Sequence, residues 1–367
     1  GSRRLRTWED PPVERGGVDE TRGEVIVRRL KTIPPIVLGA ILVTALLPVL
    51  IPVALLVDLF RFATRRVPFM AIRGLLVLWV YLVGEAIAML VFLLVWLFAL
   101  GPRRQAWLHA STWHVQQIWA GSLFAAARFA LGLKVSVEGD DQVAPGPMIV
   151  LVRHASIIDN LLPSVFVARA HRIRLRYLLK RELLNDPGLD IGGKRLPNYF
   201  VRRGTGAEVE RENVRRLAEG MGPEDGMLIF PEGTRFTEER RRGMIDKIAE
   251  RDPALATRAE AIRHLLPPKV GGVLAILDGA PDADVIAMGH VGFDGLRLIS
   301  EIWQGVLVGR EIRVRFRRIP RADIPADADG RVAWLFDTWL EMDGWIGEQL
   351  ERRAAAAAPR PTPAPVS

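Results

Sequence analysis

Two long apolar segments stand near the start of the chain. Residues 32–57 contain no charged side chain, and residues 74–100 contain only Glu85. At 1.5 Å per residue, each segment is long enough as a helix to cross the roughly 30 Å hydrocarbon core of a bilayer. The pattern therefore predicts two membrane helices, with a pair of buried core helices as the alternative. Pro48 and Pro52 in the first segment allow either a kinked span or a re-entrant hairpin.

The segment after the second apolar stretch predicts another helix. Residues 105–131 carry Trp113, Ile118, Trp119 and Phe124 at spacings compatible with an apolar helical face. Such a helix could lie on the membrane surface or pack against a globular domain, and the sequence favours neither. We expect residues 1–31 to form a loose tail of mixed polar composition. The Ala/Pro-rich residues 354–367 predict a disordered tail.

The rest of the chain alternates between short apolar runs and helical patterns. The apolar runs predict strands at residues 133–137, 148–152, 175–179, 227–230, 285–288 and 312–316. The helical patterns lie at residues 157–169, 207–219, 254–265 and 329–353. This alternation predicts an α/β domain over residues 105–353, layered around a largely parallel central sheet. The membrane segments would then occupy residues 32–104. In parallel sheets, ligand-binding groups gather at the carboxyl ends of the strands.

Composition supports the membrane prediction and narrows the chemistry. Apolar residues make up 49% of the chain, and the mean hydropathy is +0.16. The absence of cysteine excludes disulfide scaffolds, thiolate metal sites and cysteine nucleophiles. Fifty Lys and Arg residues against forty-two acids give a net charge of +8, which favours anionic partners. Six basic residues lie outside the pair of apolar segments and four lie in the link between them. This small excess predicts that the N-terminal tail and the domain after the pair lie together on the cytoplasmic side.

A histidine and an aspartate follow the strand predicted at residues 148–152. His154 comes just after the strand, and Asp159 lies in the first turn of the predicted helix. The carboxylate could fold back on the imidazole, fix its tautomer and leave the other ring nitrogen as a general base. Spacing alone leaves a purely structural role for this pair equally plausible.

A second polar group follows the strand at residues 227–230. Here Pro231-Glu232-Gly233-Thr234-Arg235 presents a turn with backbone N–H groups, a hydroxyl, a carboxylate and a guanidinium. Arg235 is suited to binding a phosphate monoester through two parallel hydrogen bonds. Glu232 cannot bind an anion, and we expect it to orient Arg235 or a substrate hydroxyl, or to hold the turn.

These two groups together resemble the motifs of the glycerolipid acyltransferases, the family of the 1-acylglycerol-3-phosphate (lysophosphatidic acid) acyltransferases. The resemblance rests on His-x4-Asp followed by Phe-Pro-Glu-Gly-Thr-Arg, and it covers roughly residues 105–350. Its first motif usually begins with Asn, where this chain has Arg153, while Ser156 matches. Further matching segments contain Lys180, Arg203 and the run 266–272, the last similar to the lysocardiolipin acyltransferase branch. Arg153, and Pro197 at a usual Gly position, put the identity of the acceptor in doubt.

The resemblance implies a membrane-bound O-acyltransferase. It would move a fatty acyl group from acyl-CoA or acyl carrier protein to a lysophospholipid, with 1-acyl-sn-glycerol 3-phosphate as the expected acceptor and no resident cofactor or metal. His154 and Asp159 would be catalytic. The resemblance assigns substrate binding to Ser156, Lys180, Arg203, Glu232, Gly233, Thr234 and Arg235. Lys269 could contact substrate or support its loop. The protein would lie in the plasma (inner) membrane of a cell.

A basic region between the two motifs supports an anionic substrate or membrane surface. Residues 169–216 contain thirteen Lys and Arg residues and six acids. Other lysolipid acceptors, such as lysophosphatidylinositol, lysocardiolipin or glycerol 3-phosphate, are the nearest alternatives. A catalytically silent membrane scaffold is a further alternative, which the intact motifs argue against. Nucleic-acid binding is not expected, because few aromatic residues accompany the basic ones.

Overall fold

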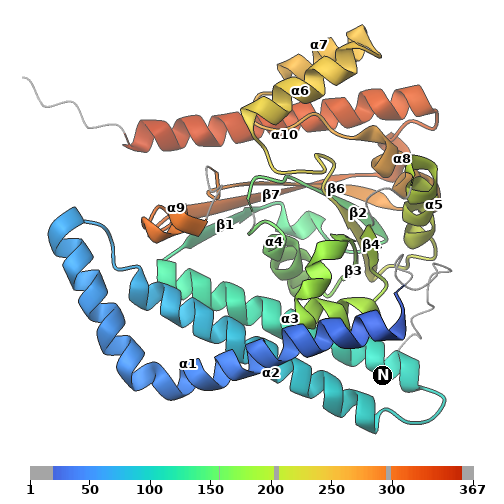
Figure 1. Ribbon diagram of the computed structural model, residues 1–367. Helices are drawn as coiled ribbons and strands as arrows, with labels where there is room; N and C mark the ends of the chain where they lie inside the picture. The colour runs from blue at the N-terminus through green and yellow to red at the C-terminus, as the bar shows by residue number, and fades with distance from the viewer. Residues whose placement is uncertain (1–19, 157, 202–205, 295–298, 358–367) are drawn as a thin grey trace, which may run out of the picture.

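A seven-stranded sheet forms the centre of the molecule (Figure 1). The computed structural model describes residues 20–156, 158–201, 206–294 and 299–357. The strand order is β1-β7-β6-β2-β5-β3-β4, and every neighbouring pair is parallel except β6 and β7. The strands are β1 (Lys134–Glu138), β2 (Met148–Val152), β3 (Arg174–Lys180), β4 (Tyr199–Val201), β5 (Asp225–Ile229), β6 (Asp284–Val291) and β7 (Glu311–Ile319). The predicted α/β class with a largely parallel sheet is confirmed. The sequence analysis missed only β4, which has three residues.

Helices cover both faces of the sheet, giving a layered domain (Figure 1). One buried cluster joins the sheet to α5 (Ala207–Ala218), α7 (Pro253–Ala261), α8 (Val270–Gly279) and α10 (Ala328–Ala357). A second cluster joins the opposite face to α3 (Arg104–Leu131), α4 (Leu161–Pro163) and the π-helical turn η2 (Ser164–Arg169). Smaller elements are α6 (Glu238–Ala249), α9 (Ile299–Trp303), η1 (Asp140–Gln142), η3 (Arg181–Asn185), η4 (Leu189–Gly193) and η5 (Arg321–Asp323). All five residues of β2 are buried, as expected of a central strand covered on both faces.

The two apolar segments form the long helices α1 (Arg22–Arg65) and α2 (Ala71–Phe98). In their most apolar 18-residue windows only 11% and 22% of residues are buried. A core helix of a soluble protein would bury most of such a window, so these helices present apolar side chains that need a non-aqueous surrounding. By length and composition both are candidate membrane spans.

Helix α1 is continuous and bent (Figure 1), so the first apolar segment does not turn back on itself as a re-entrant hairpin. Pro48 and Pro52 lie within the helix. Each lacks an N–H and places its ring against the preceding turn, which is the ordinary cause of a helix kink.

The helix also starts earlier than the sequence analysis expected. Residues 22–31 were assigned to a loose tail, but they are helical. Thr21 and Glu24 form a capping box, in which the Thr21 hydroxyl accepts from the Glu24 N–H and the Glu24 carboxylate accepts from the Thr21 N–H. These bonds satisfy backbone donors that would otherwise be free at the helix start, and so extend the helix beyond the apolar run.

Helix α3 packs between α2 and the domain rather than standing apart from it. Leu108, Ala120 and Phe124 are buried, and the Phe124 ring meets Phe166 of η2 edge to face at 5.4 Å. Of the two alternatives open at the sequence level, the structure therefore has the packed helix. Phe129 remains 81% exposed at its far end.

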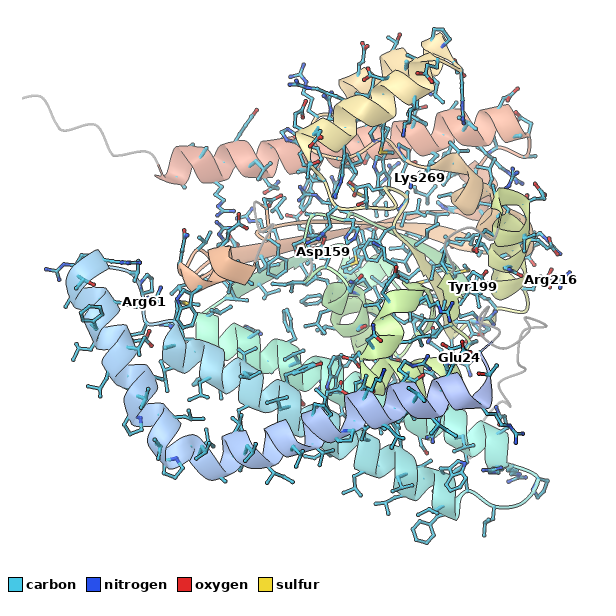
Figure 2. All side chains as sticks on the ribbon, in the orientation of Figure 1. Glu24, Arg61, Asp159, Tyr199, Arg216 and Lys269 are labelled. Atoms are coloured by element: carbon cyan, nitrogen blue, oxygen red, sulfur yellow. The ribbon has the colours of Figure 1, made fainter. Side chains whose placement is uncertain are left out.

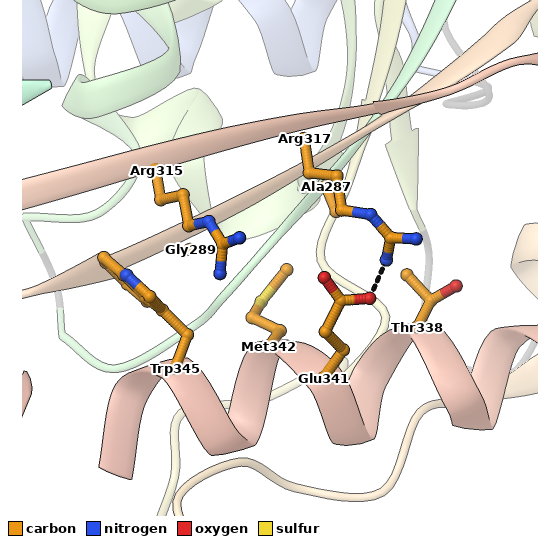
Figure 3. A pocket seen from close by; sticks show the side chains of 8 residues that line it. All are labelled: Ala287, Gly289, Arg315, Arg317, Thr338, Glu341, Met342 and Trp345. Atoms are coloured by element: carbon orange, nitrogen blue, oxygen red, sulfur yellow. Dashed lines mark hydrogen bonds and ion pairs between the residues drawn. The ribbon is translucent and has the colours of Figure 1, made fainter. Parts of the chain in front are cut away.

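Helix α10 lies across one face of β6 and β7. Figure 3 shows a small cleft in this contact, where Arg317 of β7 forms an ion pair with Glu341 of α10. Its free volume is about 20 Å³, which is enough for about one water molecule and no ligand. The helix continues to Ala357, so the first residues of the predicted disordered tail are helical.

Candidate active site

The two polar groups found in the sequence lie side by side at one edge of the sheet. Strands β2 and β5 are parallel neighbours, with Leu151 opposite Ile229, so the loops that follow them start together. The Phe236 N–H donates to the His154 carbonyl at 3.1 Å and joins the loops directly. Arg235, the residue before Phe236, is therefore brought beside the His154 loop by its backbone.

Asp159 organises the loop that carries His154. Its Oδ2 accepts from the backbone N–H groups of Ala155 and Ser156, both at 2.5 Å, and its Oδ1 accepts from the Ser156 hydroxyl at 2.7 Å. Asp159 is fully buried near the middle of the molecule (Figure 2). Burial by itself raises the pKa of this carboxyl, but the imidazoles of His290 and His154 and the Ser156 bonds outweigh it and hold the pKa below its usual range. Asp159 is thus ionised.

The imidazole of His154 sits at the mouth of this loop. Its Nδ1 lies 3.4 Å from Asp159 Oδ2, a long contact of the kind that tightens when substrate binds. The ring packs against Phe230 at 4.7 Å between centroids and is 13% exposed. Within the described residues no hydrogen bond to Nε2 is found, so this nitrogen is available to a ligand. The arrangement fits a base whose tautomer is fixed by a carboxylate.

A second histidine stands behind Asp159. His290 of β6 is fully buried, with Nε2 at 3.6 Å from Asp159 Oδ1 and 3.2 Å from the Arg153 carbonyl. Burial lowers the pKa of His290, against the opposing effect of the Asp159 charge. His290 is not marked by any local motif, because it lies 131 positions beyond Asp159 and the β2–β6 pairing brings it near.

Arg153 turns inward, away from the mouth of the site. Its guanidinium is 4% exposed, donates to the His290 carbonyl at 2.5 Å and pairs with Asp294 at 2.6 Å. Burial raises the pKa of Asp294, but the Arg153 charge and the Gly292 N–H more than offset this, so the pair is ionic. The departure from Asn at this position therefore supplies an internal ion pair.

Glu232 and Ser156 are buried and bond to the loops of the site. The resemblance implied substrate binding for both, and the structure gives each a supporting contact inside the protein. One Glu232 oxygen accepts from the His154 N–H at 2.6 Å, and the other accepts from the Leu266 N–H at 2.9 Å. Glu232 thus holds the turn, one of the roles considered for it, and ties three loops together. Ser156 bonds to Asp159.

Helix α10 extends this support from the far side of the domain. The Asp343 carboxylate accepts from the backbone N–H groups of Arg263, His264 and Leu265 at 2.6–3.0 Å. The indole of Trp339 donates to the Leu266 carbonyl at 3.1 Å. A continuous series of bonds therefore runs from α10 through the 263–266 loop and Glu232 to the backbone of His154.

Burial gives Glu232 an unusual titration. It raises the pKa to about 8, against the opposing effect of the Leu266 and His154 N–H groups. A carboxyl group with a raised folded-state pKa contributes stability that is complete below its unfolded value of 4.5 and is lost as pH rises through 8. We therefore expect the wild-type unfolding midpoint to fall between pH 6.5 and 8.5 more steeply than that of Glu232→Gln.

Thermal unfolding in detergent at several pH values measures this slope. The window avoids the range below pH 6.5, where protonation of His290 acts in the opposite direction. Parallel lines for the two proteins would show that Glu232 does not titrate in this range.

The turn after β5 places a lysine next to a glycine. Gly233 has φ +66°, a left-handed conformation that favours glycine, and an added Cβ would lie 2.7 Å from the Lys269 ammonium. The Lys269 N–H donates to the Pro231 carbonyl at 2.8 Å. Lys269 is exposed, while Thr234 and Arg235 are half-buried. Arg235, in the turn after β5, and Lys269, in the loop before α8 and labelled in Figure 2, are thus two cations on adjoining loops.

The other predicted phosphate ligands are less defined. Lys180 is exposed at the carboxyl end of β3, where it pairs with Val201 of β4. Arg203 lies outside the described residues. Much of the basic region is bound within the protein: Arg176 is buried and donates to three backbone carbonyls, and Arg215 pairs with two glutamates. These arginines of the basic region are therefore not free to bind an external anion. Among the described residues no cluster of three possible metal ligands is found.

Residues 134–279, which include both loops and Lys269, match the family model described as Acyltransferase. This part of the chain is an acyltransferase domain. The resemblance noted from the sequence is thereby confirmed at the level of the family.

Relatives of this acyltransferase domain carry several names. Lysocardiolipin acyltransferase 1 from Danio rerio is 25% identical over 67% of this chain and 63% of its own length. The 1-acyl-sn-glycerol-3-phosphate acyltransferase gamma of Mus musculus is 30% identical over 53% of this chain and 51% of its own length. Lysophosphatidylinositol acyltransferase 10 of Caenorhabditis elegans is 22% identical over 63% of this chain and 59% of its own length. The chain thus spans about half to two thirds of the length of these relatives.

Among solved structures, the 1-acyl-sn-glycerophosphate (LPA) acyltransferase PlsC from Thermotoga maritima is similar. The superposition has a TM-score of 0.46 at 16% identity, and covers 78% of this chain and all of that one.

Proposed function

We propose that the protein transfers a fatty acyl group from a thioester to the free hydroxyl of a lysophospholipid. The proposed acceptor is 1-acyl-sn-glycerol 3-phosphate, which would give phosphatidic acid, and the donor is acyl-CoA or acyl carrier protein. The observation that carries this proposal is His154, oriented by ionised Asp159, with an available Nε2 beside the Arg235 loop of an acyltransferase domain.

The proposed reaction is a direct acyl transfer. His154 Nε2 accepts the hydroxyl proton while the oxygen attacks the thioester carbonyl carbon. The tetrahedral intermediate then collapses, the carbon–sulfur bond breaks, and the thiolate takes the proton from the imidazolium. Asp159 stabilises the imidazolium between these steps. No resident cofactor takes part in this scheme.

The cations Arg235 and Lys269 would bind the acceptor phosphate. Arg235 offers a planar pair of donors, and Lys269 adds a positive charge beside Gly233. Lys180, at the end of β3, and Arg203 are proposed to bind the phosphates of the donor or the membrane surface.

We also propose that α1 and α2 anchor the protein in a membrane, with the acyltransferase domain on the cytoplasmic side. Support comes from their apolar exposed surfaces and from the excess of basic residues outside the helix pair. An inner (plasma) membrane location belongs to the same proposal.

The acceptor assignment is tested with purified protein, acyl-CoA and a panel of lysolipids. We expect product from lysophosphatidic acid at the highest kcat/KM. Faster acylation of lysocardiolipin or lysophosphatidylinositol would contradict this assignment and identify that lysolipid as the acceptor. The 266–272 segment and the names of two relatives favour these alternatives. Lysolipid binding without product for any acceptor would instead indicate a silent membrane scaffold.

Replacing Arg235 separates binding from chemistry. We expect Arg235→Ala to raise the KM for lysophosphatidic acid by about 10-fold to 100-fold, because a hydrogen-bonded charge contributes about 1.5–3 kcal/mol. The kcat should change much less. Steady-state kinetics with varied acceptor measure both values.

Arg242→Ala is the matched control, since Arg242 lies on the next helix, is 74% exposed and pairs only with Glu238 among the described residues. A fall in kcat without a change in KM for Arg235→Ala would contradict its assignment to phosphate binding.

A further inference from the structure

A large apolar groove lies between the two N-terminal helices. It has a volume of about 990 Å³ and is lined by the first half of α1 and the second half of α2. Ile33, Val37 and Ile41 line it from α1, and Leu90 and Trp96 line it from α2. The two helices are in contact and lie below the sheet in Figure 1. The groove is as large as a site for a drug-sized ligand and is nearly all apolar.

One end of the groove is cationic. Arg29 of α1 and Arg195, which follows η4, are the two charged residues in its lining. Arg104, at the start of α3, lies over the Trp96 ring at 6.0 Å. Burial, together with the nearby Arg29 and Arg104 charges, lowers the pKa of Arg195. Three guanidinium groups therefore gather where the groove meets the acyltransferase domain.

Arg195 lacks an anionic partner in the described part of the chain. Its Nη2 donates to the Phe92 carbonyl at 3.1 Å, whereas its Nη1 is buried without an acceptor. Arg29 bonds through Nε to Asp190 at 2.6 Å, and Asp190 is shared with Arg28 and Lys194. A buried donor without an acceptor is costly, and the cost is greater for a charged group. An anion at this point would remove it.

We propose that the groove binds an anionic phospholipid, with an acyl chain between α1 and α2 and the phosphate on Arg195, Arg29 and Arg104. From Arg29 to Thr44 the groove follows α1 for about 22 Å, at 1.5 Å per residue. This exceeds the roughly 15 Å depth of hydrocarbon in one leaflet. The charged end and the apolar length together match a lipid better than free phosphate.

This site is separate from the proposed acceptor site. Its lining comes from α1, α2, Ile191 of η4 and Arg195, and includes no residue of the loops after β2 and β5. A lipid bound here would join the helix pair to the acyltransferase domain. The inference rests on the membrane insertion of α1 and α2 proposed above, but not on the reaction.

Thermal unfolding of the delipidated full-length protein in detergent tests the proposal. Dioleoylphosphatidylglycerol should raise the wild-type midpoint by several degrees, because a ligand that binds only the folded state stabilises it. Dioleoylphosphatidylcholine and inorganic phosphate should have little effect. Arg195→Gln should lose more than half of the shift. Arg65→Gln, at the opposite end of α1, should keep the shift and is the matched control.

Each other outcome overturns a defined part of the proposal. If phosphatidylcholine raised the unfolding midpoint equally, the groove would not recognise the anionic head group. If inorganic phosphate raised it equally, the site would bind an anion but not specifically a lipid. An undiminished shift of the midpoint in Arg195→Gln would show that Arg195 does not bind the lipid phosphate.

If Arg195→Gln does not fold, fluorescence of the wild type provides a second test. Phosphatidylglycerol with brominated chains should quench the wild type more than Trp96→Phe, and brominated phosphatidylcholine should not distinguish them. Equal quenching of both proteins by brominated phosphatidylglycerol would overturn the proposal. Neither readout depends on activity, so a failure of the proposed reaction would leave this result unchanged.

Discussion

Replacing His154 by alanine is expected to lower kcat by about 10²-fold to 10⁴-fold, the usual contribution of a general base. The fold should persist, since the bond from the Phe236 N–H to the His154 carbonyl and the bond from the His154 N–H to Glu232 both use the backbone. Initial rates with acyl-CoA and the acceptor measure the loss, and thermal unfolding checks the fold.

His171→Ala is the matched control. His171 also pairs with an aspartate, the exposed Asp140, but it lies outside the candidate site. We expect this variant to keep wild-type kcat. If folded His154→Ala retains more than a tenth of wild-type activity, His154 is not the base.

Replacing Asp159 by asparagine is expected to lower kcat by about 10²-fold with little change in acceptor KM. The amide oxygen can still accept from the Ala155 and Ser156 N–H groups, and the amide nitrogen can donate to the Ser156 hydroxyl. What disappears is the negative charge that stabilises the protonated His154. Steady-state kinetics measure the effect, with Asp140→Asn as the control on the surface pair.

The double variant provides the sharper test. If Asp159 acts only through His154, then His154→Ala/Asp159→Asn should be no slower than His154→Ala alone, because residues that act as a unit are not additive. A further tenfold loss in the double variant would assign Asp159 a separate role, such as a direct contact with substrate.

Local signals predicted the parts of the fold that local sequence controls. The length of each apolar segment gave both N-terminal helices, and short apolar runs gave six of the seven strands. The early start of α1 was also present in the sequence, as Thr21 followed by Glu24 three positions later, but it was overlooked. Helices α6 and α8 were missed because charged residues outnumber apolar ones in the first, and the second is apolar with two adjacent glycines.

The candidate site divides in the same way. His154, Asp159 and the turn at Gly233 were readable from short motifs placed after strands. The ion pair of Arg153 and the bond from Leu266 to Glu232 were not, because the partners Asp294 and Leu266 are distant in the sequence. His290 became visible only with the strand order, since the register with Val152 opposite Met288 brings His290 against Arg153 and Asp159. Long-range pairing carries information that spacing along one chain does not.

The segment that matches the family ends at residue 279, yet the architecture does not divide there. Strand β6 is inserted between β2 and β7 and supplies His290, while Asp343 of α10 secures the loop that bonds to Glu232. A fragment cut at the family boundary would leave β2 with an unpaired edge and Glu232 without its anchored partner. The smallest unit able to hold His154 in place therefore reaches at least to α10, well beyond the most recognisable part of its sequence.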